Sequence, residues 1–86
     1  MSNRKKLTAS PPSDMGENIR KWRELRCVKQ QLLAARLGIT PGAMSNIENN
    51  KAGVSTDRLQ QIASCLEIDV RLLFSNPLDL IASRAR

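Results

Sequence analysis

The sequence predicts an all-α fold, a single compact domain built from five short helices. Apolar residues recur at helical spacing in several stretches, most completely at Leu59, Ile62, Ala63 and Leu66, which follow the i, i+3, i+4, i+7 pattern. Glycine, proline and N-capping residues stand between these stretches, where short helices would end and begin. The 86 residues suit one domain, and a core of about sixty residues is sufficient when its helices pack well.

Residues 1–13 differ in composition from the rest of the chain. They contain Arg4, Lys5 and Lys6, then Ser-Pro-Pro-Ser, and show no apolar periodicity. This composition is typical of a disordered arm. Two interpretations stay open: a solubilising tail, or a basic arm that lies along DNA and becomes ordered on binding.

The first helix is predicted over about residues 14–26. Asp14 can act as its N-cap, and Glu17 stands three residues later, as in a capping box. Ile19 and Trp22 form the inner face at helical spacing. Trp22 is therefore expected in the core.

The second helix is predicted over about residues 29–37. Leu33, Ala34 and Leu37 fall on one face of it. Gly38 follows directly and can take a positive φ at no steric cost, which ends the helix.

The third helix is predicted over about residues 41–49. Thr40 offers an N-cap oxygen, and Pro41 occupies the first helical position, where a missing N–H costs nothing. Met44 and Ile47 continue an apolar face. Two short helices joined by so tight a turn form a helix-turn-helix.

The last two helices follow a loop. Ser55 can cap the fourth helix, which carries the apolar pattern described above, and Asp69 can cap a short fifth helix over residues 70–75. Asn76-Pro77 ends that helix. We therefore divide the chain into a basic arm, a helix-turn-helix domain and a C-terminal tail that can serve dimerisation, at 1–13, 14–76 and 77–86.

With these elements in place, the sequence resembles the helix-turn-helix family of phage repressors, Cro proteins and Xre-type bacterial regulators. The resemblance covers about residues 15–74 and includes motifs outside the helix pair. These motifs are Ile19-Arg20-x-x-Arg23, Gln30, Leu59-x-x-Ile62-Ala63-x-x-Leu66-x-Ile68 and Leu73-Phe74. It implies a lambda-repressor-like five-helix fold. It also implies a sequence-specific transcriptional regulator, expected to be a repressor, whose third helix enters the major groove of double-stranded DNA.

The residues expected to contact bases lie on the outer face of the third helix: Pro41, Gly42, Ser45 and Asn46. The major groove admits an α-helix, and base edges there carry an unambiguous code of donors and acceptors. Asn46 can bond bidentately to adenine, and Ser45 can bond to a base or a phosphate. Pro41 and Gly42 depart from the family, which commonly has polar side chains there, so we expect more readout of DNA shape.

The residues expected to hold phosphates frame the helix pair. The resemblance assigns this role to Gln30, at the start of the second helix, and to Asn49 and Lys51, just past the third. Lys29 and Thr40 are weaker candidates. Free N–H groups at the start of the second helix also attract anions.

The resemblance has two structural implications. Arg23 and Glu48 match a family arginine and glutamate, so we expect a partly buried ion pair between the first and third helices. Cys27 stands where the family often has glycine. Because a β-carbon makes a left-handed conformation costly, we expect the joint after the first helix to differ. Asn50 also replaces a family glycine, but asparagine tolerates that conformation.

Composition limits the remaining functions. The 14 Lys and Arg against 8 Asp and Glu give a formal charge of +6, which favours nucleic acid or an acidic membrane surface as partner. Two aromatic residues are too few for single-strand stacking. With no histidine and no Cys-x-x-Cys pair, we expect no metal, no cofactor and no enzymatic activity. No segment is apolar enough to span a membrane. Two isolated cysteines suit a cytoplasmic protein, and the resemblance implies one that is bacterial or phage-encoded.

The expected partners are a palindromic DNA operator and a second copy of the chain. One recognition helix covers too little DNA for tight binding, so family members pair two domains. The apolar residues that could form this surface are Leu72, Phe74, Leu78, Leu80 and Ile81. The alternatives are a tail that folds back on its own core or is disordered. The alternative function is a protein-binding module on the same fold, of the antitoxin or coactivator type.

Overall fold

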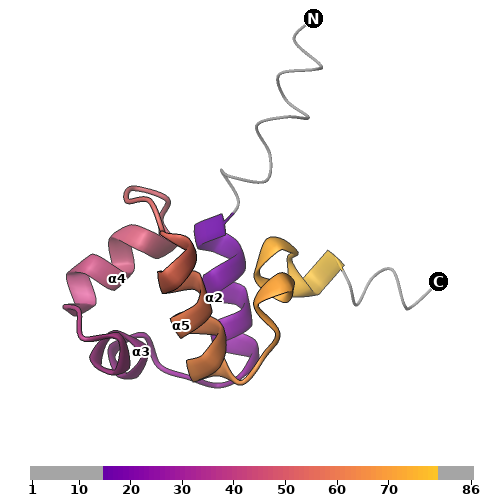
Figure 1. Ribbon diagram of the computed structural model, residues 1–86, viewed down its shortest axis with the longest axis horizontal. Coiled ribbons are helices and arrows are strands. Elements are labelled where there is room, and N and C mark those ends of the chain that lie inside the picture. Colours follow the sequence, from indigo (N-terminus) through magenta and orange to yellow (C-terminus); the bar gives the residue numbers. More distant parts are fainter. Residues whose placement is uncertain (1–14, 80–86) are drawn as a thin grey trace, which may run out of the picture.

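The fold is all-α in the part of the chain that the computed structural model describes, residues 15–79 (Figure 1). It consists of α2 (Met15–Leu25), α3 (Gln30–Leu37), α4 (Pro41–Glu48), α5 (Thr56–Leu66) and the 3-10 helix η1 (Val70–Phe74). The helix-turn-helix pair is α3 and α4. The helices α2 and α5 cross the middle of the molecule, with this pair on one side and η1 on the other (Figure 1). The predicted fold class is confirmed.

One hydrophobic core joins all five helices. Its fully buried large side chains are Ile19, Leu33, Met44, Ile62, Leu66 and Leu73. The apolar spacing of the sequence predicted this face of each helix. Trp22 is also in the core, with 8% of its surface exposed, as expected. Its indole Nε1 donates to the Ser75 carbonyl oxygen at 2.8 Å, which ties the end of η1 to α2.

Three helix starts have the predicted caps. Thr40 Oγ1 and Ser55 Oγ each accept from the backbone N–H three residues later, at 3.0 and 3.1 Å. Asp69 Oδ1 accepts from the Arg71 N–H at 2.8 Å. Hydrogen bonds from the Arg71 side chain and backbone lower the pKa of the Asp69 carboxyl to about 2. The cap predicted at Asp14 lies outside the described residues.

All four α-helices end in the same motif. Each is followed by a residue with positive φ: Cys27 at 60°, Gly38 at 73°, Asn50 at 61° and Glu67 at 59°. The residue after it donates its N–H to the carbonyl five positions earlier, at 2.8 to 3.0 Å. This is the Schellman arrangement, which satisfies carbonyls that the helix leaves free.

The prediction of a different joint after the first helix is wrong. Cys27 takes the left-handed conformation in spite of its β-carbon. Two backbone hydrogen bonds of 3.0 Å close the joint, from Cys27 N to Glu24 O and from Val28 N to Arg23 O, and Val28 packs against the core. These interactions together offset the strain of one residue.

The segment after η1 is packed onto the domain. Asn76 Oδ1 accepts from the Leu78 N–H at 2.8 Å, and residues 77–79 are helical. Pro77 occupies the first position of this turn and is buried. The sequence predicted the end of the fifth helix here but not the new helical turn.

Candidate nucleic-acid interface

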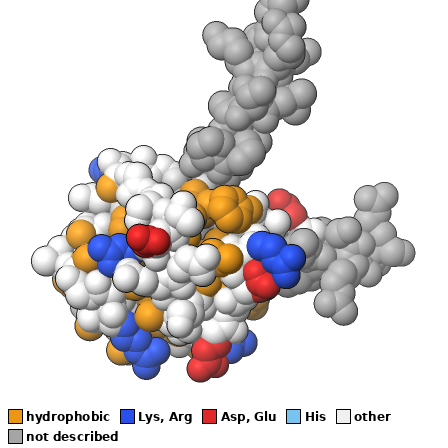
Figure 2. All heavy atoms as spheres, in the orientation of Figure 1, with side chains coloured by type: hydrophobic (Ala, Val, Ile, Leu, Met, Phe, Trp, Pro, Cys, Tyr) orange, Lys and Arg blue, Asp and Glu red, His pale blue; other side chains and the backbone are white. Residues whose placement is uncertain are grey.

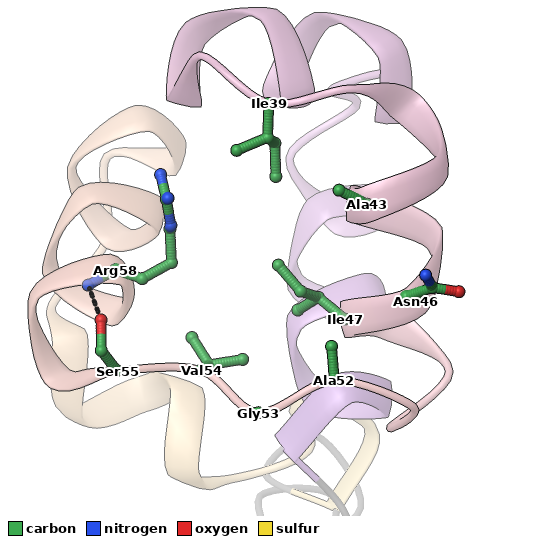
Figure 3. Close-up of a pocket in the computed structure, with 9 residues that line it drawn as sticks. All are labelled: Ile39, Ala43, Asn46, Ile47, Ala52, Gly53, Val54, Ser55 and Arg58. Atoms are coloured by element: carbon green, nitrogen blue, oxygen red, sulfur yellow. Dashed lines mark hydrogen bonds between the residues drawn. The ribbon is translucent and has the colours of Figure 1, made fainter.

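The helix α4 is anchored by one face and presents the other to solvent. Met44 and Ile47 enter the core. The opposite face carries the predicted base-contacting residues, of which three are exposed and Ser45 is half-buried: Pro41, Gly42, Ser45 and Asn46. Asn46 projects away from the helix pair (Figure 3). The outer face is therefore free to meet a partner.

The first turn of α4 has an open, smooth surface. A β-carbon at Gly42 would meet nothing closer than Thr40 Oγ1, at 3.9 Å, and φ is not in the left-handed region. The fold therefore does not require glycine at this position. With Pro41 beside it, Gly42 lets another molecule approach the backbone of α4 closely.

A buried carboxylate fixes α4 against the two preceding helices. Arg23 Nε donates to Glu48 Oε2 at 2.7 Å, and Arg23 Nη2 donates to Glu48 Oε1 at 3.1 Å. Both side chains are buried, with 10% and 2% exposed. Arg23 Nη1 also donates to the Val28 carbonyl oxygen at 2.8 Å, which ties the pair to the joint before α3.

Gln30 belongs to the same network. Its Nε2 donates to Glu48 Oε1 at 3.0 Å, and the side chain is half-buried at the first position of α3. Glu48 thus joins residues of α2, α3 and α4. The predicted ion pair between Arg23 and Glu48 is confirmed, but sequence reasoning did not foresee that Gln30 shares the Glu48 carboxylate.

The other predicted phosphate contacts lie before α3, in the turn between α3 and α4, and after α4. Lys29, Thr40, Asn49 and Lys51 are all exposed. Lys29 makes no side-chain cap, as expected for a poor capping residue. Asn49 Nδ2 is 3.3 Å from Ser45 Oγ. The predicted arm contacts, Arg4, Lys5 and Lys6, lie outside the described residues.

A shallow groove of about 400 Å³ runs beside α4, toward the loop before α5 (Figure 3). Apolar side chains line it, including Ile39, Ile47 and Val54, and none of its lining residues is acidic. Arg58 closes one side, where its Nη1 donates to the Leu37 carbonyl oxygen at 3.0 Å. The groove adds an uncharged or basic margin to the outer face of α4.

One structural contact near this face was missed in the sequence. The Gly16 N–H donates to Asn50 Oδ1 at 2.8 Å, and a β-carbon at Gly16 would overlap the carbonyl oxygen of Ile47. The start of α2 therefore packs on the end of α4, backbone against backbone. A glycine in the first turn of an amphipathic helix, where it lowers helix stability, was the available signal.

None of the helices in residues 15–79 is long and apolar enough to cross a membrane. Within the same residues, no group of three or more cysteine, aspartate or glutamate side chains could hold a metal ion.

Comparisons with known proteins agree with this arrangement. The helix-turn-helix family model matches residues 19–73, more than half of the chain. No curated protein sequence matches. Among solved structures, the clp gene regulator ClgR from Corynebacterium glutamicum has a similar fold, with a TM-score of 0.72, 23% identity, 86% of this chain covered and 79% of that chain. The restriction-modification controller protein C.AhdI from Aeromonas hydrophila has a TM-score of 0.68, 23% identity, and 74% and 93% coverage.

Proposed function

The chain belongs to the helix-turn-helix family of DNA-binding transcriptional regulators, and we propose that it is a repressor that inserts α4 in the major groove of a specific duplex site. The observation that carries this proposal is the two-faced character of α4. Its inner face is fixed by the core and by Glu48, while its outer face is exposed and carries hydrogen-bonding side chains. A rigid helix with a free polar face suits base readout.

We assign base contacts to the outer face of α4. The Asn46 amide bonds to the adenine edge, and the Ser45 hydroxyl bonds to a base or a phosphate. Pro41 and Gly42 offer no side-chain hydrogen bond, so they contribute close approach and contact with a thymine methyl group. Specificity then also depends on DNA shape.

We assign phosphate contacts to the residues that flank α3 and α4. Gln30, Lys29 and the free N–H groups of α3 hold the backbone on one side, together with Thr40. Asn49 and Lys51 hold it on the other. Contacts of this kind fix the register of the protein on the duplex without reading sequence.

We extend the assignment to the basic arm. Gly16 packs on the end of α4, so α2 begins beside Asn50, the residue before Lys51. From there to Lys6, an extended chain reaches up to about 30 Å. This is enough for Arg4, Lys5 and Lys6 to meet phosphates outside the footprint of the folded domain.

We propose a symmetric homodimer on a palindromic operator. Phe74 and Leu78 each have 57% of their surface exposed. Hydrophobic side chains gather over η1, beside the start of α2 (Figure 2). A two-fold contact there would bury these groups isologously. The predicted contributions of Leu80 and Ile81 lie outside the described residues. We place the protein in the cytoplasm, where its DNA partner is found.

One observation favours a second function. The first turn of α4 lacks hydrogen-bonding side chains, which also suits a protein partner in place of DNA. The chain would then be a binding module of the antitoxin or coactivator type.

Selection of bound sites from random duplexes, followed by affinity measurements against salt, tests the proposal. We expect a palindromic consensus and an affinity that falls steeply with salt. Each phosphate contact contributes about 0.9 to the slope of log affinity against log salt concentration. Deletion of residues 1–10 should therefore lower this slope by up to roughly 2.7. An unchanged slope would make the arm a solubilising tail. Failure to enrich any duplex sequence would favour the protein-binding alternative.

A further inference from the structure

The Gln30 amide has a defined orientation in the absence of DNA. Its partner, Glu48 Oε1, belongs to a carboxylate with 2% of its side-chain surface exposed, paired with Arg23. An ionised carboxylate can only accept hydrogen bonds, so the amide nitrogen of Gln30, and not its oxygen, must face it. One N–H of that nitrogen is thereby occupied, and the other is left to donate.

This orientation matters because of where Gln30 lies. It is the first residue of α3, where backbone N–H groups are free and the helix dipole favours an anion. An amide turned the other way would present its oxygen to that anion and repel it. Glu48 itself adds no net repulsion, because the Arg23 guanidinium neutralises it at 2.7 Å.

We propose that Glu48 is a positioning residue for DNA binding: its buried carboxylate holds the Gln30 amide so that the second N–H donates to a DNA phosphate. The inference rests on the proposed function. Glu48 does not touch DNA. It acts by ordering the Gln30 side chain before the complex forms. Binding then does not carry the entropic cost of immobilising this side chain.

The test compares matched apolar substitutions on the selected operator. Gln30→Met removes the donor, and the pair Arg23→Met with Glu48→Met removes the carboxylate without stranding a charge, a replacement that is often neutral for stability. Gln31→Met is the control, because Gln31 is exposed on the same helix and its side chain forms no hydrogen bond to Glu48 within residues 15–79. Each operator phosphate is replaced in turn by an uncharged methylphosphonate.

We expect several phosphates in each half-site to weaken parent binding when replaced, and one of them to do so through the Gln30 amide. This interference should vanish in Gln30→Met and equally in the Arg23→Met, Glu48→Met pair, with a loss of affinity of about tenfold for each. The variant that combines all three substitutions should lose no more affinity than Gln30→Met alone. Gln31→Met should behave as the parent.

The base preference of the paired variant distinguishes a loss of Gln30 positioning from a displacement of α4 as a whole. If Glu48 acts through Gln30, the paired variant should keep the parent consensus at the Asn46 contact. Loss of that preference, or phosphate interference that persists at parent strength, would overturn the inference. If the paired variant does not fold, the pair Arg23→Leu with Glu48→Leu supplies the same comparison, because it also removes the acceptor of the Gln30 amide without stranding a charge. A parent that binds no duplex would instead refute the proposed function.

Discussion

The Gly16 N–H donates a 2.8 Å hydrogen bond to the side chain of Asn50, so the residue that ends α4 also caps the start of α2. The backbone of Asn50 is left-handed, at φ 61°, and its N–H bonds to the Ile47 carbonyl oxygen at 3.1 Å. One residue therefore has a local role in ending a helix and a long-range role in joining two helices.

Two substitutions separate these roles. Asn50→Gly keeps the left-handed backbone and loses only the cap, so the free energy of unfolding should fall by about 1 kcal/mol. Asn50→Ala should lower it by roughly 1–2 kcal/mol more, because alanine, unlike glycine and asparagine, is strained in the left-handed conformation. Urea unfolding measures both, with the exposed Asn49→Ala as control. Equal stability of parent and Asn50→Gly would show that the cap contributes nothing.

Substitution by glycine at the left-handed residues Cys27 and Glu67 should stabilise the fold. Cys27→Gly and Glu67→Gly should each raise the free energy of unfolding by up to about 1 kcal/mol, because relief of strain exceeds the added chain entropy. The surface pair that Glu67 forms with Arg26, at 3.4 Å, contributes little. Gly38→Ala is the opposite control and should lower the free energy of unfolding. No atom lies within 4 Å of the new β-carbon, so this decrease reports backbone strain alone. Thermal unfolding of the three variants checks the signs.

Removal of one partner of the Arg23–Glu48 pair should lower the free energy of unfolding strongly, whereas replacement of both should change it little. Glu48→Ala strands a buried guanidinium and should lower the free energy of unfolding by about 3–5 kcal/mol. Joint replacement of both residues by methionine should leave stability near that of the parent. Chemical denaturation decides: if Glu48→Ala unfolds at the parent midpoint, the pair does not stabilise the fold.

Asn46 and Lys51 should affect DNA binding differently. Asn46→Ala should relax the preference at one base pair of each half-site, with a loss of roughly 1–3 kcal/mol on the operator. Lys51→Ala should weaken binding to all duplexes alike and lower the salt slope by about 0.9. Titrations on specific and random DNA test this contrast. The assignment fails if both variants lose the same affinity on both.

The dimer proposal predicts an effect of exposed apolar residues. Phe74→Gln and Leu78→Gln should weaken binding to a full palindrome far more than to a single half-site. The centres of the two half-sites in the palindrome are expected about 34–36 Å apart. Leu32→Gln is the control, because Leu32 is 44% exposed but lies on α3. Sedimentation should show a dimer for the parent and the control. A parent that is monomeric and binds the palindrome one to one would rule the dimer out.

Sequence patterns were sufficient for the core and for three of the helix starts. Apolar spacing determines which face of a helix is buried, and caps such as Thr40 and Ser55 act within three residues. The prediction for Cys27 failed because it weighed one residue's propensity without the two backbone hydrogen bonds that close the joint. Propensity is a weak prior that such contacts override.

The contacts missed around the candidate site are of another kind. Gly16 and Asn50 are 34 positions apart, and Gln30 and Glu48 are 18 apart. Their meeting depends on how α2, α3 and α4 cross, which no local pattern encodes. The sequence therefore supplied candidate residues for the site, whose DNA contacts stay predictions, but not the bonds that orient them.

The open space at Gly42 has a consequence for how this domain can diversify. Nothing in the fold lies within 3.9 Å of a β-carbon there, and Pro41 and Asn46 also face solvent. Mutations at these positions change the surface without disturbing the scaffold, so duplicated genes can drift toward new target sequences through folded intermediates. The same separation makes the domain a host for combinatorial libraries, in which three positions that we propose as base contacts are varied on one invariant framework.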